Sequence, residues 1–292
     1  MIPRVDTITL QHDGHARTAR LAVPPSGSCS ALVVMLHGTG GNARYAAEET
    51  RWHEYAGPRQ VAVLYPDGLP VDPANPPKFL TNPQRWNDGS AVPGEPFYSR
   101  VDDVGFLAAL VEHVRASLNI DRGRVLLSGF SNGAGMTFRI AAERPELFAA
   151  IAPVAGYCAV APMCGSVPTP TLYISGDADL LIPLHGGPVQ LPWGNRVVQR
   201  TSVAERLGPW AVALGCDGKR TRIEEEPGVI ATTYTGPVPF VHLTVAGLGH
   251  HWPGGRGAFN PRIAGPLSHR LDGCARVWRF FGECGSLLPH WH

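Results

Sequence analysis

Short apolar segments recur along this chain, separated for the most part by segments in which apolar residues follow helical spacing. An unbroken apolar run such as residues 31–36 predicts a strand buried on both faces, because a strand with one wet face would alternate with polar residues. Strands that alternate with helices predict an α/β fold with a mainly parallel sheet and helices on both faces. An opening hairpin is expected at 7–10 and 19–23, and further strands at 31–36, 61–65, 124–128, 148–154, 171–175, 229–235 and 241–245. Helices are expected from 42 to about 51–55, from 101–103 through 114, from 133 to about 143, at 203–214 and at 275–281.

The chain of 292 residues shows no internal repeat and no obvious linker, so residues 1–292 are expected to form a single domain. Two connections rich in proline and glycine interrupt the pattern, at about 66–100 and 182–195. Irregular connections of that length inside a compact domain are more often binding loops or lids than simple links. Both are therefore expected near the functional site.

Positive and negative side chains nearly balance, since 25 Lys and Arg stand against 24 Asp and Glu. Without a basic patch the chain has no electrostatic attraction for nucleic acid or an anionic membrane, so neither is expected as a partner. No segment approaches the roughly 18 apolar residues of a membrane-spanning helix. No signal peptide is visible at the N-terminus, which favours a cytoplasmic location; a trimmed mature form of a secreted or periplasmic protein is the alternative.

The six cysteines fit no metal-binding spacing. Neighbours in the sequence, Cys158 with Cys164 and Cys274 with Cys284, could form disulfides, and reduced buried thiols are the alternative. The glycine cluster at 37–41 is too short for a phosphate loop and has no lysine. Neither a metal nor an organic cofactor is expected.

Residues 129–133 read Gly-Phe-Ser-Asn-Gly, which matches G-x-S-x-G. The motif follows an apolar strand and precedes a helix, the context in which a sharp turn pushes the serine out at the end of a sheet. Glycine is needed on either side because the chain turns too tightly for a side chain there. Ser131 is therefore the candidate nucleophile, whereas Ser128 lacks a glycine at the required position.

A serine hydroxyl needs a general base, and the base needs a carboxylate that orients it. In folds with this turn, the acid and then the histidine follow the serine in the chain, each after a strand. The strand at 171–175 is followed by Asp177 and Asp179, and the strand at 241–245 by His250 and His251. The order fits a catalytic triad, although spacing alone does not choose within either pair.

Backbone N–H groups must stabilise the negative oxygen that forms during acyl transfer. One is expected from Asn132, directly after the nucleophile. The other is expected from the loop that follows the strand ending at Leu36, where Thr39 is the favoured donor. A plain tight turn is the alternative role for the glycines of this loop.

Taken together, several motifs resemble the poly(3-hydroxybutyrate) depolymerase and feruloyl esterase family of α/β-hydrolases, a family similar to carbohydrate esterase family 1. The similarity runs from about residue 17 to about 282 and rests on the segments His37-Gly38-Thr39-Gly40-Gly41, Tyr65-Pro66-Asp67-Gly68, Val101-Asp102-Asp103-Val104-Gly105-Phe106, Gly129-Phe130-Ser131-Asn132-Gly133-Ala134-Gly135-Met136 and Gly249-His250-His251-Trp252-Pro253-Gly254.

This resemblance implies the α/β-hydrolase fold and selects Asp179 as the acid and His250 as the base. The chain departs from the family's H-G-x-x-D segment, because Ser175 stands where the family has histidine. The resemblance also implies substrate contacts by Trp86, His251 and Trp252; burial as a core aromatic residue is the alternative for each tryptophan. Many secreted relatives carry a cysteine after the Tyr-Thr-Gly of a late strand, as a partner for the position of Cys216, whereas this chain has Pro237.

These residues predict a serine esterase that works through an acyl-enzyme on a small-molecule or polymeric ester. The resemblance implies feruloyl and other aryl esters or hydroxyalkanoate esters as substrates. One alternative is a serine peptidase with the same triad, because that triad also hydrolyses amides. Another is a non-catalytic binding module on the same scaffold.

Overall fold

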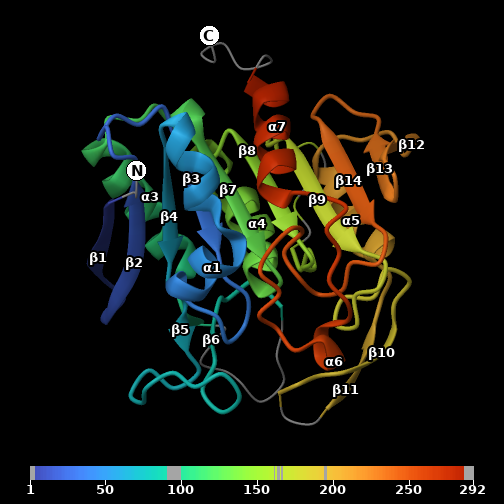
Figure 1. Ribbon diagram of the computed structural model, residues 1–292, viewed down its shortest axis with the longest axis horizontal. Helices are drawn as coiled ribbons and strands as arrows, with labels where there is room; N and C mark the ends of the chain where they lie inside the picture. The colour runs from blue at the N-terminus through green and yellow to red at the C-terminus, as the bar shows by residue number, and fades with distance from the viewer. Residues whose placement is uncertain are drawn as a thin grey trace.

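The computed structural model describes residues 4–90, 100–160, 162, 165, 167–193 and 196–285. Its central feature is a ten-stranded sheet in the order β1-β2-β4-β3-β7-β8-β9-β14-β13-β12 (Figure 1). The inner strands from β4 to β14 pair in parallel, and an antiparallel hairpin extends the sheet at each edge. The strands are β1 Arg4–His12, β2 His15–Val23, β3 Ala31–Leu36, β4 Val61–Pro66, β7 Val125–Phe130, β8 Ala150–Val154, β9 Thr171–Gly176, β12 Arg220–Glu226, β13 Val229–Tyr234 and β14 Phe240–Val245.

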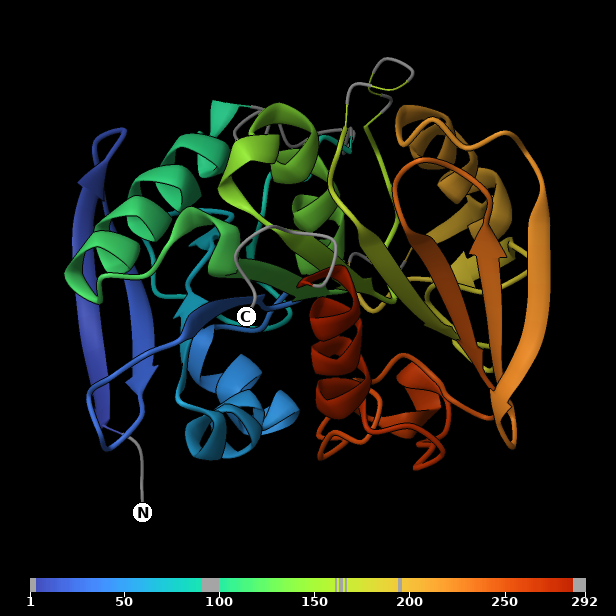
Figure 2. The same ribbon diagram turned by 90° about the horizontal axis from the view of Figure 1, so that it is seen from above.

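Helices cover both faces of this sheet (Figure 2). One face carries α3 Asp103–Ser117, α4 Asn132–Glu143 and α5 Val203–Ala213; the other carries α1 Ala43–Thr50, α2 Trp52–Ala56 and α7 Gly273–Gly285. The short helix α6 Pro261–Ala264 and the 3-10 turns Gly57–Arg59, Arg122–Arg124 and Pro145–Leu147 complete the helical segments. No helix in these ranges is both long enough and apolar enough to cross a lipid bilayer.

The core lies in two layers, one on each side of the sheet. In β3, Leu32 and Val34 pack toward α3, α4 and α5, whereas Val33 and Met35 pack toward α1, α2 and α7. Each layer is buried, so successive side chains of a central strand are mostly apolar. This is the physical reason why the unbroken apolar runs in the sequence marked the strands correctly.

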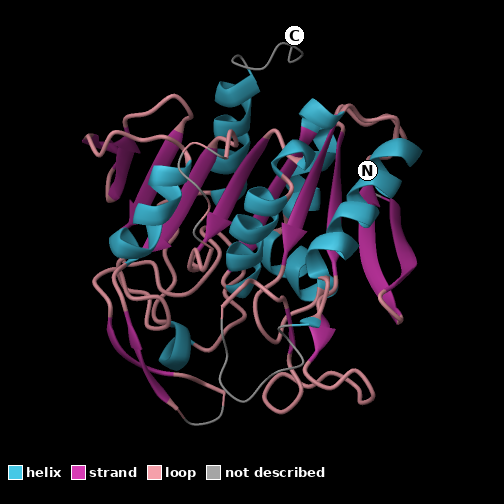
Figure 3. Cartoon of the chain, turned by 180° about the vertical axis from the view of Figure 1, so that it is seen from behind, coloured by secondary structure: helices cyan, strands magenta, loops and turns pink. Residues whose placement is uncertain are grey.

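The loops after the parallel strands gather beyond the carboxyl ends of these strands, at the bottom of Figure 1 and again in Figure 3. Two small hairpins lie there, β5 Leu69–Pro70 with β6 Gln84–Arg85 and β10 Gly187–Gln190 with β11 Val197–Arg200. In open α/β sheets ligands bind at this edge, outside the carboxyl ends of the strands.

The expected elements were found, with a few differences. The helix expected from 42 is split at Arg51, whose φ of 56° ends α1 in a left-handed turn. Strand β12 was missed because almost all of its residues are exposed, so it carries charged residues without the alternation that burial imposes. The hairpin of β10 and β11 was also missed, since the connection at 182–195 was expected to be irregular.

The cysteines described in the structure, at 29, 158, 216, 274 and 284, are all free thiols. The possible pair Cys274–Cys284 is therefore not formed. Both residues belong to α7, and ten residues of helix separate their Cα atoms by roughly 15 Å. A disulfide needs Cα atoms within about 7 Å. Cys164, the possible partner of Cys158, lies outside the described residues.

Candidate active site

Ser131 occupies the sharp turn between β7 and α4, with φ 56° and ψ −120°. Positive φ is strained for a residue with a side chain, and such strain is characteristic of functional sites. The two motif glycines allow the turn. A Cβ on Gly129 would lie 2.3 Å from the carbonyl oxygen of Gly133, and one on Gly133 would lie 2.5 Å from that of His37. The turn therefore requires both glycines and presents the serine at the carboxyl edge of the sheet.

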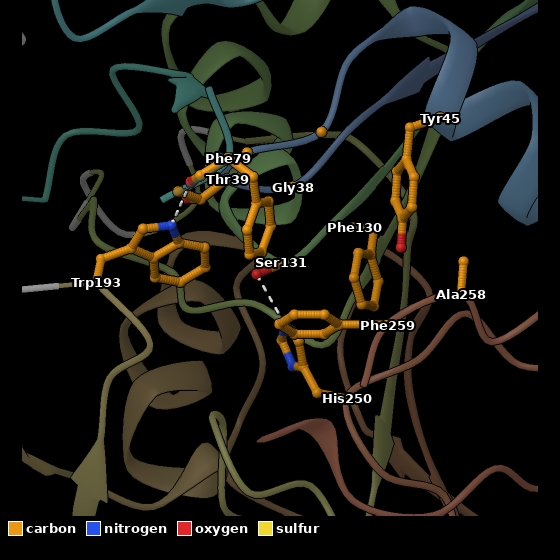
Figure 4. Close-up of a pocket in the computed structure, with 12 residues that line it drawn as sticks. Gly38, Thr39, Tyr45, Phe79, Phe130, Ser131, Trp193, His250, Ala258 and Phe259 are labelled. Atoms are coloured by element: carbon orange, nitrogen blue, oxygen red, sulfur yellow. Dashed lines mark hydrogen bonds between the residues drawn. The ribbon is translucent and has the colours of Figure 1, made fainter. Parts of the chain in front are cut away.

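Ser131, His250 and Asp179 form one hydrogen-bonded chain. His250 Nε2 lies 2.9 Å from Ser131 Oγ, and His250 Nδ1 lies 2.8 Å from Asp179 Oδ2 (Figure 4). A carboxylate only accepts hydrogen bonds, so Nδ1 carries the proton and Nε2 is left to accept from the serine hydroxyl. Asp179 and His250 are each 3% exposed. The structure thus brings together three residues from the loops after β7, β9 and β14.

The structure also distinguishes the members of each pair that spacing left open. Asp177 points to the neighbouring turn, where its Oδ1 accepts from the amide of Gly247 at 2.7 Å. Asp179 Oδ1 accepts from the amides of Leu181 and Ile182 at 2.8 and 2.7 Å, which orients its other oxygen toward His250. The two aspartates therefore have different partners, and only Asp179 meets the imidazole.

Thr39 and Asn132 lie on either side of the serine, in the loop after β3 and at the first residue of α4. Thr39 lines both cavities described below, and Asn132 lines the larger one. Within the described residues, neither amide N–H is taken up by a backbone hydrogen bond. Both are therefore free to donate to an oxygen placed beside Ser131 Oγ.

His37 holds the loop that carries Thr39, a role that the sequence did not indicate. Its Nε2 accepts from the amide of Gly68 at 2.9 Å, so its Nδ1 donates to the carbonyl of Gly38 at 2.8 Å. Burial lowers the pKa of His37 below its ordinary value, which keeps the ring neutral and this bonding pattern intact.

An apolar cavity of about 260 Å³ opens beside Ser131 and His250. Figure 4 shows aromatic rings around it, and most of its wall is apolar. Phe79 and Trp193, which come from the two proline-rich connections, lie with ring centroids 5.6 Å apart, and Trp193 Nε1 donates to the Phe79 carbonyl at 2.8 Å. The remaining aromatic lining residues are Tyr45, Phe130 and Phe259.

A larger cavity of about 630 Å³ shares Thr39, Ser131, Trp193 and His250 with the first. Its wall is more polar and includes Asn132 and several arginines. Ser131 thus stands at the junction of an apolar and a polar space.

The structure does not bring the three expected substrate contacts to either cavity, because all three side chains are buried elsewhere. Trp86 is 1% exposed, and its Nε1 donates to the carbonyl of His37 at 3.0 Å. Trp252 is 1% exposed and packs in the core layer beneath α7. His251 is 2% exposed, and its Nε2 donates to the carbonyl of Gly265 at 3.1 Å. These residues support the loops of the site and do not reach its interior.

From the connection at about 66–100, it is Phe79 and not Trp86 that lines the apolar cavity. Phe79 is 41% exposed and lies in the same connection as Trp86. Its neighbours Lys78, Leu80 and Thr81 are also exposed, and a lone aromatic residue among polar and turn residues is the signal that could have singled it out. For Trp193 the same signal was present, between Pro192 and the glycine at 194.

Among the described residues, no group of three or more His, Cys, Asp or Glu side chains is arranged to hold a metal ion. Ser131, His250 and Asp179 bring together a serine hydroxyl, an imidazole and a buried carboxylate. That set can transfer an acyl group through the serine oxygen.

Known proteins resemble this chain at the level of sequence. The family model described as Esterase PHB depolymerase matches residues 19–161. "Putative esterase NocK" from Nocardia uniformis subsp. tsuyamanensis is 32% identical over 282 residues, which is 89% of this chain and 77% of that protein. Feruloyl esterase C from Emericella nidulans is 34% identical over 86 residues, 30% of this chain and 32% of its own length.

Solved structures support the fold. An acetyl xylan esterase from Aspergillus awamori superposes with a TM-score of 0.62 at 16% identity, covering 96% of this chain and 99% of that chain. An S-formylglutathione hydrolase from Agrobacterium tumefaciens gives a TM-score of 0.59 at 14% identity, covering 95% and 94%. Sequence relatives and fold agree: the chain belongs to the esterase PHB depolymerase family and is a carboxylic ester hydrolase with the α/β-hydrolase fold.

Proposed function

We propose that this protein hydrolyses carboxylic esters through a covalent acyl-enzyme on Ser131. The observation that carries the proposal is the hydrogen-bonded chain Ser131–His250–Asp179, with distances of 2.9 and 2.8 Å. Three side chains separated by 48 and 71 positions in the sequence meet in the order that proton transfer requires. The left-handed backbone at Ser131 supports the same role, because it exposes the hydroxyl to a bound ester.

In the first half of the reaction, His250 Nε2 accepts the proton of Ser131 as its oxygen attacks the ester carbonyl carbon. The carbonyl oxygen becomes negative and accepts hydrogen bonds from the amides of Thr39 and Asn132. The imidazolium is stabilised by Asp179, and it then gives its proton to the departing alcohol oxygen as the ester C–O bond breaks. The alcohol leaves, and the acyl group stays on Ser131.

In the second half, His250 removes a proton from water, and the resulting hydroxide attacks the acyl-enzyme carbonyl. The same two amides hold the oxyanion. When the bond to Ser131 Oγ breaks, the proton on His250 returns to the serine and the carboxylic acid leaves. His250 begins each half of the reaction in the tautomer that Asp179 imposes, with its proton on Nδ1.

Aryl esters, including feruloyl esters, are the substrates that we favour. The apolar cavity has walls formed by Tyr45, Phe79, Phe130, Trp193 and Phe259, which suit a planar ring. Feruloyl esterases among the relatives support the same class. Hydroxyalkanoate esters are the second class, supported by the family model that matches residues 19–161.

The test replaces Ser131 by alanine and measures hydrolysis of p-nitrophenyl acetate, methyl ferulate and hydroxybutyrate oligomers. We expect kcat to fall by about five to six orders of magnitude, because nucleophile and base act as one unit. Ser128→Ala is the matched control. Its hydroxyl donates to the Ala152 carbonyl at 2.6 Å inside the core, so its loss should reduce stability and leave the esterase rate within about threefold of wild type.

Labelling by a fluorophosphonate completes the test. The wild-type protein should take up one equivalent and Ser131→Ala none, whereas folded wild-type protein that resists labelling would favour a binding module. Esters matched with amides of the same acids separate esterase from peptidase. A Ser131→Ala variant that keeps within tenfold of the wild-type ester rate would exclude the mechanism.

A further inference from the structure

The polar cavity beside Ser131 carries an excess of positive charge. Arg85, Arg196, Arg200 and Arg206 line it, and Asp88 is the one carboxylate among its described lining residues. That carboxylate is already engaged, because its oxygens accept from the side-chain amide of Asn132 and from Ser90. The cavity therefore presents more guanidinium groups than carboxylates to a bound molecule.

Arg200 and Arg206 are held against the same ring. The guanidinium carbon of Arg200 lies 5.1 Å from the centroid of Tyr157, and that of Arg206 lies 5.5 Å from it. Arg206 Nε donates to Thr201 Oγ1 at 2.7 Å, and the Tyr157 hydroxyl donates to the Thr201 carbonyl at 3.2 Å. Contacts of this kind fix the position of flexible side chains before a ligand binds, which lowers the entropic cost of binding.

Among the described residues, no carboxylate forms a salt bridge with Arg200. Its Nε is buried and makes no hydrogen bond to any residue that the structure describes. Burial lowers the pKa of Arg200 below its ordinary value, with a further contribution from Arg206. Arginine nevertheless stays protonated at neutral pH, so this charge is partly removed from water, and Asp88 and Asp179 favour it only without direct contact.

We propose that the polar cavity is a subsite for a carboxylate carried by one half of the ester, held by Arg200 and Arg206, while the other half occupies the apolar cavity. Guanidinium groups bind carboxylates with paired, charge-assisted hydrogen bonds. The proposal rests on the esterase function proposed above, because both cavities open on Ser131.

Two kinds of ester carry such a group. In the ester of a hydroxy acid, the carboxylate belongs to the alcohol that leaves; in the half-ester of a dicarboxylic acid, it belongs to the acyl group that stays on Ser131. The chemistry recognised by the arginines is the same. An ester with one apolar half and one anionic half is therefore the substrate class that the two cavities select.

The test compares matched esters that differ only in charge. In the first pair, 3-hydroxybutyrate carries a phenylacetyl ester on its hydroxyl, and the uncharged partner has the carboxylate replaced by an amide. In the second pair, the monophenyl ester of glutarate is compared with the phenyl ester of glutarate monoamide. We expect the wild type to favour the carboxylate in at least one pair by about tenfold or more in kcat/KM, as charge-assisted hydrogen bonds allow. The pair that shows this preference identifies the half of the ester that enters the polar cavity.

Arg200→Gln should abolish that preference, lowering kcat/KM about tenfold to a hundredfold for the charged ester and less than threefold for the neutral one, mainly through KM. Arg222→Gln removes the same charge from the exposed strand β12 and should leave the preference intact. Arg206→Gln, at an exposed residue, tests the subsite independently of folding and should reduce the preference several-fold.

Binding of glutarate to the Ser131→Ala protein, measured by calorimetry, examines the subsite without turnover. Weaker binding in Ser131→Ala/Arg200→Gln supports the proposal. Equal use of both esters in both pairs, or a preference that survives Arg200→Gln and Arg206→Gln, overturns it. Failure of the esterase function itself would be seen separately, as absence of p-nitrophenyl acetate hydrolysis and of Ser131 labelling.

Discussion

Replacing Asp179 by asparagine tests the arrangement of the site with the smallest change in shape. The carboxylate now accepts three hydrogen bonds, from the amides of Leu181 and Ile182 on one oxygen and from His250 Nδ1 on the other. Asparagine has a single oxygen. If that oxygen stays with the two amides, the side-chain NH₂ faces the imidazole and can only donate to it.

The imidazole must then change its tautomer. With Nδ1 accepting from the new amide, the proton moves to Nε2, which can no longer accept from Ser131. The wrong tautomer in a serine–histidine–aspartate site lowers kcat by about 10⁴. That factor corresponds to about 5.4 kcal/mol of transition-state stabilisation. Because the loop amides keep their acceptor, we expect the variant to remain folded.

The assay is steady-state hydrolysis of p-nitrophenyl acetate, with circular dichroism to confirm folding. Asp177→Asn is the matched control two residues away: its remaining oxygen can still accept from Gly247, so its rate should stay within about threefold of wild type. An Asp179→Asn protein within tenfold of the wild-type rate would refute this reasoning. A large loss in Asp177→Asn instead would move the role of the acid to the neighbouring residue.

Three further perturbations follow from the packing. Gly133→Ala places a Cβ 2.6 Å from the Leu36 carbonyl oxygen and should lower the free energy of unfolding by about 3 kcal/mol, whereas Gly282→Ala, in open space on α7, should not lower it. Trp193→Ala should raise KM for feruloyl esters about tenfold and leave KM for alkyl acetates nearly unchanged. Burial lowers the pKa of His242 to about 4. As the pH falls from 7 to 5, the free energy of unfolding of the wild type should therefore fall by about 2 kcal/mol, and His242→Gln should not show this loss.

Urea denaturation measures the two stability effects. The sign for His242 follows from proton binding: between pH 6.5 and 4 the unfolded chain binds the proton and the buried, folded imidazole does not, so acid favours unfolding. An equal change in midpoint for wild type and His242→Gln would contradict it. For Gly133, an unchanged midpoint would show that the turn can relax. For Trp193, an equal rise in KM with alkyl acetates and feruloyl esters would place its effect outside the cavity.

Much of the fold could be predicted because its signals are local. Unbroken apolar runs marked β3 and β4, since a strand covered on both faces buries nearly every side chain in an apolar layer. The G-x-S-x-G motif was equally local, because the glycines are needed within two residues of Ser131. Strand β12 gave no such signal, since an exposed edge strand buries too little to impose a pattern.

The choice of Asp179 shows where local reasoning stopped. Two aspartates two residues apart look alike in the sequence, and only resemblance to relatives separated them. In the folded protein, the amide of Gly247, seventy residues away along the chain, binds Asp177, and the imidazole that follows it binds Asp179. The partner that distinguishes the two carboxylates is supplied by a different strand.

Apart from β12 and the small hairpins, the sequence by itself determined the order of strands and helices, the turn at Ser131 and the kinds of residue available for catalysis, because each depends on neighbours along the chain. Only the tertiary structure decided which aromatic residues form the apolar cavity and which arginines face the polar one. Phe79, Trp193 and Phe259 meet across loops far apart in the sequence, while Trp86 turns into the core to reach the His37 carbonyl. Whether a side chain faces a cavity or the core depends on what packs against it, and that is fixed only when distant segments meet.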